Sequence, residues 1–97
     1  MQEQIFIGRI ASVVIFRVPE FGPRVRFTIE VSGQHAVGCA AEGDIARDFI
    51  AHYSEGDEVL VRGIYEPRPS TAAANTRWVA RFRVRALHIA QEADLVA

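Results

Sequence analysis

The sequence predicts an all-β domain: a small five-stranded barrel with one short helix between the third and the fourth strand. Three observations support this prediction. The chain has 97 residues, enough for one domain but too few for two, so residues 1–97 are expected to form a single unit. Hydrophobic residues make up 49% of it, which is sufficient for a buried core. Five segments have the residue pattern of strands, and only one has helical spacing.

The first three strands are predicted from apolar segments separated by turn residues. Residues 4–16 are apolar on both faces at each end, which indicates a strand covered from both sides, and Gly8 allows a bend or bulge within it. A turn with two prolines and a glycine follows at 19–23. Residues 24–31 then alternate between polar and apolar side chains, as a half-buried strand does, and residues 35–41 are expected to form a third strand.

The apolar spacing changes to a helical period between residues 42 and 56. The residues that recur at this spacing are Ile45, Phe49, Ile50 and Tyr53. Asp44 is a suitable N-cap for this helix, and Gly56 is a suitable residue to end it.

Two strands follow the helix, at 58–65 and 77–89, and a polar loop containing prolines joins them. A short acidic tail closes the chain at 91–97, so the folded core is expected to span about residues 4–90. Three strands, one helix and two strands are the element order of the OB fold, a Greek-key barrel. We therefore predict an OB fold with its helix at one end of the barrel.

Charge is unevenly distributed along the chain, although the formal net charge is only −1. All eleven basic residues are arginine, whose planar guanidinium suits phosphate and stacks on bases. Residues 42–58 contain six acids and one arginine, whereas residues 62–85 contain six arginines and one acid. This asymmetry predicts an acidic helix and a basic hairpin formed by the last two strands.

Several classes of function are not indicated by the sequence. It contains no long apolar run and no signal-peptide pattern, so no membrane association is expected. Cys39 is the only cysteine, which favours a reducing, cytoplasmic location. His35 and Cys39 have no second pair of ligands to complete a metal site, so we expect no metal or other cofactor. Nucleophile motifs, paired catalytic carboxylates and phosphate-binding glycine loops are missing, and we expect the protein not to be an enzyme.

Four segments resemble the bacterial single-stranded DNA-binding protein (SSB) family in order and spacing: GRIASVVIFR, RVRFTIEV, DIARDFIAHYSEGDEVLVRGIYEPRPS and RWVARFRVRALHI. The strongest part is the helix followed by the GDEVLVRG block, and the resemblance spans about residues 4–90. It implies an OB fold and binding of single-stranded DNA without sequence specificity in replication, repair or recombination. The family's acidic C-terminal tail has no counterpart here, so the chain also resembles the tail-less primosomal PriB-type proteins.

The candidate binding residues are arginines and aromatic residues of the second, fourth and fifth strands. By alternation, the arginines at 77, 81, 83 and 85 share one face, and a stripe of one sign is typical of nucleic-acid binding. Tyr65 is the preferred platform for base stacking, with Trp78 or Phe21 beside it. Five further phenylalanines are expected in the core, namely Phe6, Phe16, Phe27, Phe49 and Phe82. The full candidate set is Arg24, Arg26, Arg62, Tyr65, Arg68, Arg77, Trp78, Arg81, Arg83 and Arg85.

Two alternatives remain open at the level of sequence. The arginines bind the backbone of single-stranded DNA or RNA, or they form a solvated strand face that pairs with acids across the sheet. The third predicted strand, HAVGCAA, has no base-stacking side chain, which favours a protein-interaction module or an oligomeric accessory subunit instead. The doubly apolar first strand predicts a homo-oligomer, a dimer or tetramer, and the family resemblance adds a replication or recombination protein as a possible partner.

Overall fold

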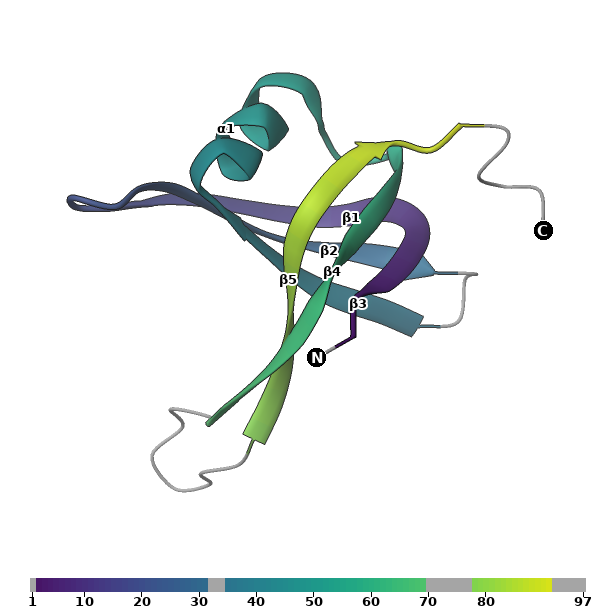
Figure 1. The fold of residues 1–97 in the computed structure, drawn as a ribbon. Helices are drawn as coiled ribbons and strands as arrows, with labels where there is room; N and C mark the ends of the chain where they lie inside the picture. Colours follow the sequence, from purple (N-terminus) through teal and green to yellow (C-terminus); the bar gives the residue numbers. More distant parts are fainter. Residues whose placement is uncertain (1, 32–34, 70–77, 92–97) are drawn as a thin grey trace.

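The five strands close into a barrel in the order β1-β2-β3-β5-β4, and one helix covers an end of it (Figure 1). The computed structural model describes residues 2–31, 35–69 and 78–91. Its elements are β1 (Gln4–Val18), β2 (Gly22–Val31), β3 (His35–Glu42), α1 (Gly43–His52), β4 (Glu58–Pro69) and β5 (Trp78–Ile89). A closed five-stranded barrel with its helix between β3 and β4 is the predicted OB architecture.

Strand β1 is shared between two neighbours. Its first part, Gln4–Arg9, pairs with β4, and its second part, Arg9–Val18, pairs with β2. Gly8 lies close to the turning point, where an added Cβ would come within 2.5 Å of the Glu30 carbonyl oxygen. Backbone pairing with both neighbours covers the edges of the strand but not its outer face, where Ile5 and Val14 are each 59% exposed. The barrel itself therefore does not provide the cover on both sides that the sequence predicted.

Bulges in β1 and β5 change which side chains face the barrel interior. In β1 the register shifts between Ile10 and Ser12. Even-numbered residues face the barrel interior before the shift and odd-numbered residues after it: Ile10 is buried, and Val13 packs against the core. In β5 Arg62 pairs with Ala86 and Gly63 with Val84, which leaves Arg85 as the extra residue. The strand alternation predicted from sequence therefore holds only up to each bulge.

The helix is shorter than the sequence predicted, and both predicted caps are wrong. Glu42 is the N-cap residue, while Asp44 lies in the first turn, where its carboxylate accepts a 2.8 Å hydrogen bond from Arg47. At the other end the Tyr53 N–H still donates to the Phe49 carbonyl at 2.9 Å, but the extended backbone of Tyr53 (φ −123°, ψ 153°) ends the helix there. Gly56 lies in the following turn. The sequence pattern identified the helix but not the residues that limit it.

Aromatic side chains connect the helix to the barrel interior. Phe49 is 1% exposed, and its ring centroid lies 4.6 Å from that of Phe27 on β2. A second cluster lies between β1, β4 and β5, where the Phe82 ring is 5.1 Å from Phe6 and 5.2 Å from Tyr65 in edge-to-face contacts. Both clusters belong to one core.

Strand β4 continues beyond the predicted boundary at Tyr65. The sequence places Pro67 and Pro69 in a loop, but both pair with β5, opposite Ala80 and Trp78. Because the prolines are two residues apart, their missing N–H groups face the same edge of the strand, and the ladder on the other edge continues. Figure 1 shows the resulting β4–β5 hairpin extending away from the end that α1 covers.

Cys39 is buried in this core, and its thiol is expected to be unreactive in the folded protein. The side chain is 3% exposed, and burial raises its pKa to about 12. At about pH 8 roughly one thiol in 10⁴ is then ionised, and the thiolate is the reactive form. We expect no reaction with a chromogenic disulfide reagent within minutes for folded protein and complete reaction in denaturant. Equal rates for folded and unfolded protein would contradict this placement.

Candidate nucleic-acid groove

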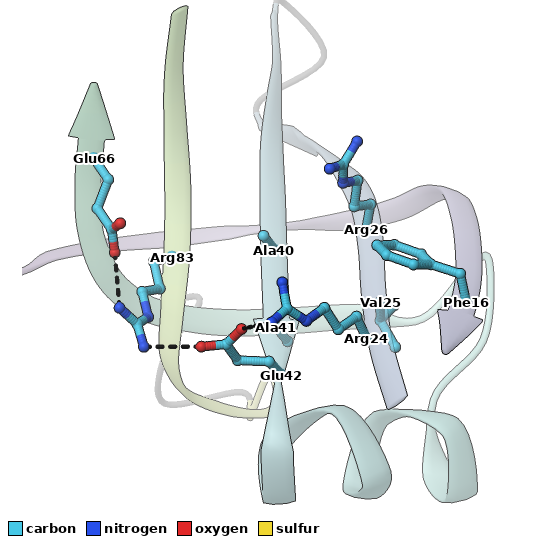
Figure 2. A pocket seen from close by; sticks show the side chains of 9 residues that line it. All are labelled: Phe16, Arg24, Val25, Arg26, Ala40, Ala41, Glu42, Glu66 and Arg83. Atoms are coloured by element: carbon cyan, nitrogen blue, oxygen red, sulfur yellow. Dashed lines mark hydrogen bonds and ion pairs between the residues drawn. The ribbon is translucent and has the colours of Figure 1, made fainter. Parts of the chain in front are cut away.

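A groove lies on the outer surface of the barrel across β2, β3 and β5 (Figure 2). Its walls carry three arginines: Arg24 and Arg26 from β2 and Arg83 from β5. The pairing brings these strands together, because Arg26 lies opposite Ala40 on β3 and Ala40 in turn pairs with Arg83. The residues that line the groove are Phe16, Arg24, Val25, Arg26, Ala40, Ala41, Glu42, Glu66 and Arg83.

Strand β3 forms the floor of the groove, and its outer face carries only small side chains there. Ala40 lines the groove, and Gly38, two residues earlier, belongs to the same face. An added Cβ at Gly38 would meet no heavy atom within 4 Å, so space is open above it. The lack of aromatic side chains that the sequence showed in this strand therefore produces a depression between the arginines.

Two carboxylates lie among the groove arginines. Glu42 bridges the groove: its Oε1 lies 3.0 Å from Arg83 Nη2 and its Oε2 lies 3.4 Å from Arg24 Nη2. Arg83 also donates a 3.1 Å hydrogen bond from Nη1 to Glu66 Oε1 (Figure 2). All four side chains are at least 35% exposed, and ion pairs of this exposure are weak, about 0.2–1 kcal/mol each. The groove arginines are thus partly neutralised but remain accessible.

Arg26 has a different environment from Arg24 and Arg83. It forms no ion pair with any other residue that the structure describes, and its guanidinium carbon lies 5.4 Å from the centroid of the Phe16 ring. The sequence prediction that Phe16 belongs to the core is wrong. The bulge in β1 changes the parity of the strand after Ile10, so Phe16 lies on the outer face opposite Arg24. The groove therefore contains the aromatic ring of Phe16, which the residue alternation had assigned to the core.

Two of the other candidate arginines lie outside the groove. Arg62 and Arg85 both approach Glu3, at 3.5 Å and 3.9 Å from its carboxylate oxygens, and neither lines the groove. For Arg62, Arg83 and Arg85, the pairing with acids that the sequence left open is present. The same holds for Arg24.

The aromatic candidates are also separated. Tyr65 lies on the inner side of β4, where its ring makes edge contacts with Phe6 and Phe82, and burial raises its pKa. The arrangement therefore does not bring Tyr65 together with the groove arginines. Phe21 is 69% exposed in the turn between β1 and β2, with the Arg24 guanidinium 5.9 Å from its ring centroid. Phe21 thus extends the row formed by Phe16 and the arginines of β2.

The remaining candidates belong to the far part of the β4–β5 hairpin. In the ladder Arg68 lies opposite Val79, Trp78 opposite Pro69 and Arg81 opposite Glu66. The structure does not describe the side chains of these three residues, and Arg77 lies outside the described residues.

Within the described ranges, no three histidine, cysteine, aspartate or glutamate side chains come together in a group that could hold a metal ion. No helix in these ranges is long and apolar enough to cross a membrane.

The barrel topology and the position of the helix define an OB fold. No family model matches the chain, and no curated protein matches it. Among solved structures, the small single-stranded DNA-binding protein from Streptomyces coelicolor is similar, with a TM-score of 0.70 and 20% identity over 92% of this chain and 94% of that one. The second single-stranded DNA-binding protein (SSBb) from Mycobacterium smegmatis has a TM-score of 0.78 and 21% identity, over 93% and 87% of the two chains. The fold implied by the sequence resemblance is confirmed.

Proposed function

We propose that this protein binds single-stranded DNA in the groove over β2, β3 and β5, without sequence specificity. The observation that carries this proposal is the position of Arg24, Arg26 and Arg83 around one open groove, with the Phe16 ring beside Arg26. Guanidinium groups bind phosphates, and an exposed ring face stacks on any base. The fold shared with two single-stranded DNA-binding proteins supports the choice of ligand.

The lack of sequence specificity follows from the groups that the groove offers. Contacts from arginine to phosphate position a nucleic acid but carry no sequence information. Ring stacking tolerates every base. RNA presents the same phosphates and base faces, so oligo-dT and oligo-U of equal length both serve as probes, and we expect oligo-dT to bind at least as tightly.

The expected affinity is modest, because Glu42 and Glu66 offset part of the arginine charge. Fluorescence anisotropy with labelled oligo-dT at ~50 and ~200 mM salt tests the proposal. We expect a Kd of roughly micromolar or below at the lower salt and much weaker binding at the higher salt, since phosphate binding releases counterions. If the folded protein does not bind at ~50 mM salt, the proposed function is wrong.

We further propose that the protein is a homo-oligomer assembled through β1. Ile5, Val14 and Ile15 of this strand are 59%, 59% and 54% exposed, and a second copy of the chain would remove them from water. A dimer would also provide two grooves and steepen the salt dependence of binding. Light scattering coupled to gel filtration should give a mass of at least twice 10.8 kDa, whereas a monomer at micromolar concentration would contradict the assembly.

A second candidate function is that of an interaction module or accessory subunit. It is favoured by the pairing of Arg24 and Arg83 with acids of the same chain, which leaves less positive charge for nucleic acid. The anisotropy titration separates the two functions, because an interaction module assembles without binding oligo-dT. For the leading function we propose a role in replication, repair or recombination in the cytoplasm, with no catalytic step and no cofactor.

A further inference from the structure

The Glu42 side chain lies in the groove, although its backbone begins the helix. Glu42 occupies the N-cap position of α1, where a side chain commonly accepts a hydrogen bond from the first turn. It makes no such bond, and its two carboxylate oxygens instead contact Arg83 and Arg24 at 3.0 Å and 3.4 Å. Figure 2 shows the carboxylate between these arginines, which come from different strands. The orientation of Glu42 is thus set by the groove and not by the helix.

This carboxylate presents to the arginines what a nucleic-acid backbone presents. A phosphodiester, like a carboxylate, carries one negative charge shared by two oxygens and accepts hydrogen bonds from guanidinium groups. We propose that Glu42 occupies a phosphate position, that single-stranded nucleic acid enters the groove by displacing it, and that Glu42 therefore limits the affinity of the site. This proposal rests on the proposed function and identifies the residue that regulates it.

Two features make the carboxylate replaceable. The Glu42 side chain is 45% exposed and its partners Arg24 and Arg83 are 35% and 52% exposed, so both ion pairs are of the weak, solvent-screened kind. The pairing of Arg24 is also incomplete: its Nε is buried and has no hydrogen-bond partner among the described residues.

Displacement of Glu42 by a phosphate changes how nucleic-acid binding depends on salt concentration. A phosphate that binds free arginines releases its counterion to the solvent. A phosphate that displaces Glu42 also exposes a carboxylate, which attracts a cation and so offsets part of that release. Removing the charge of Glu42 should therefore tighten binding and steepen the dependence of log K on log salt.

The test compares Glu42→Gln with Glu55→Gln in oligo-dT anisotropy titrations across a salt series. Both variants remove one negative charge, but Glu55 lies in the turn between α1 and β4 and does not line the groove. We expect Glu42→Gln to bind oligo-dT about three- to tenfold more tightly than wild type, and the slope of log K against log salt to be steeper by up to ~0.7. Glu55→Gln should change the affinity by less than about twofold. Glu42→Ser is a second variant, in which the N-terminus of α1 should stay folded because serine is a favoured N-cap residue.

The outcomes separate this inference from the function on which it rests. If wild type binds and both Glu42 variants bind no more tightly than Glu55→Gln, the inference is wrong and the proposed function stands. If neither wild type nor any variant binds, both are wrong. If the wild type does not bind and the Glu42 variants do, the proposed function is wrong for the wild type, and the limit that Glu42 sets on the affinity of the groove is supported.

Discussion

Replacing Arg24, Arg26 and Arg83 together with alanine is expected to weaken the binding of oligo-dT by about 100-fold at low salt. All three line the groove, and Arg26 also lies over the Phe16 ring. At about 1 kcal/mol for each exposed contact to phosphate, the three losses together give a factor of this size. The slope of log K against log salt should become shallower by about 2, at ~0.7 per lost contact to single-stranded nucleic acid. Anisotropy titrations at several salt concentrations measure both quantities.

The matched control replaces Arg9, Arg17 and Arg47 with alanine. These arginines are exposed and do not line the groove, so the net charge changes equally while the groove is preserved. We expect a loss of only a few-fold, from the weaker long-range field. Equal losses in the two triple variants would show that binding depends on overall charge and not on the groove.

Gly63→Ala is expected to destabilise the fold by about 3 kcal/mol. Gly63 lies opposite the bulge in β5, where an added Cβ would overlap the carbonyl oxygen of Arg83 and lie 2.9 Å from its carbonyl carbon. Both atoms belong to the backbone of a paired strand, so relief of the overlap requires the β4–β5 ladder to shift. In a domain of this size the melting temperature should fall by roughly 10–20 °C.

Gly38→Ala provides the control for this variant. It is the same substitution in a strand, but its new Cβ would meet nothing within 4 Å. We expect its melting temperature to stay within about 3 °C of wild type, or to rise slightly because alanine restricts the unfolded chain. Similar melting temperatures for the two variants would contradict the close approach of β4 and β5 at Gly63.

Much of the fold could be predicted from sequence, because residue period and turn chemistry are local. The alternation in 24–31 and the helical spacing of residues such as Phe49 each identified their element correctly. Element ends were less predictable: β4 continues through Pro67 and Pro69 because only one edge of the strand loses its N–H groups. Such an extension depends on a neighbouring strand, which local sequence does not reveal.

The site could be predicted only in part, because faces and partners depend on long-range structure. Arg24, Arg26 and Arg83 were identified as candidates, and the structure brings them together around the groove. Phe16 was missed because the register shift between Ile10 and Ser12 reverses the alternation. Gly8 indicated a bend or bulge in this strand, but not the residue at which the alternation changes.

Glu42 was grouped with the acids of the helix, although its side chain reaches β5. Its contact with Arg83 joins residues 41 positions apart in sequence. A small clue was available, because Glu42 immediately follows a predicted strand whose outer face carries only small residues. The electrostatics of the groove therefore could not be derived from charge distribution along the chain.

An NMR titration of ¹⁵N-labelled protein with oligo-dT tests directly whether single-stranded DNA binds in the groove, since it locates binding at individual residues. We expect the largest changes in amide chemical shift on the strands that form the groove, at Arg24, Arg26, Ala40 and Arg83. The shift changes of these amides should follow one binding curve with a single Kd. Amides of the helix around Asp48 should change little. Saturable binding with its largest shift changes on the helix, or on parts of the barrel away from the groove, would contradict binding of single-stranded DNA in the groove.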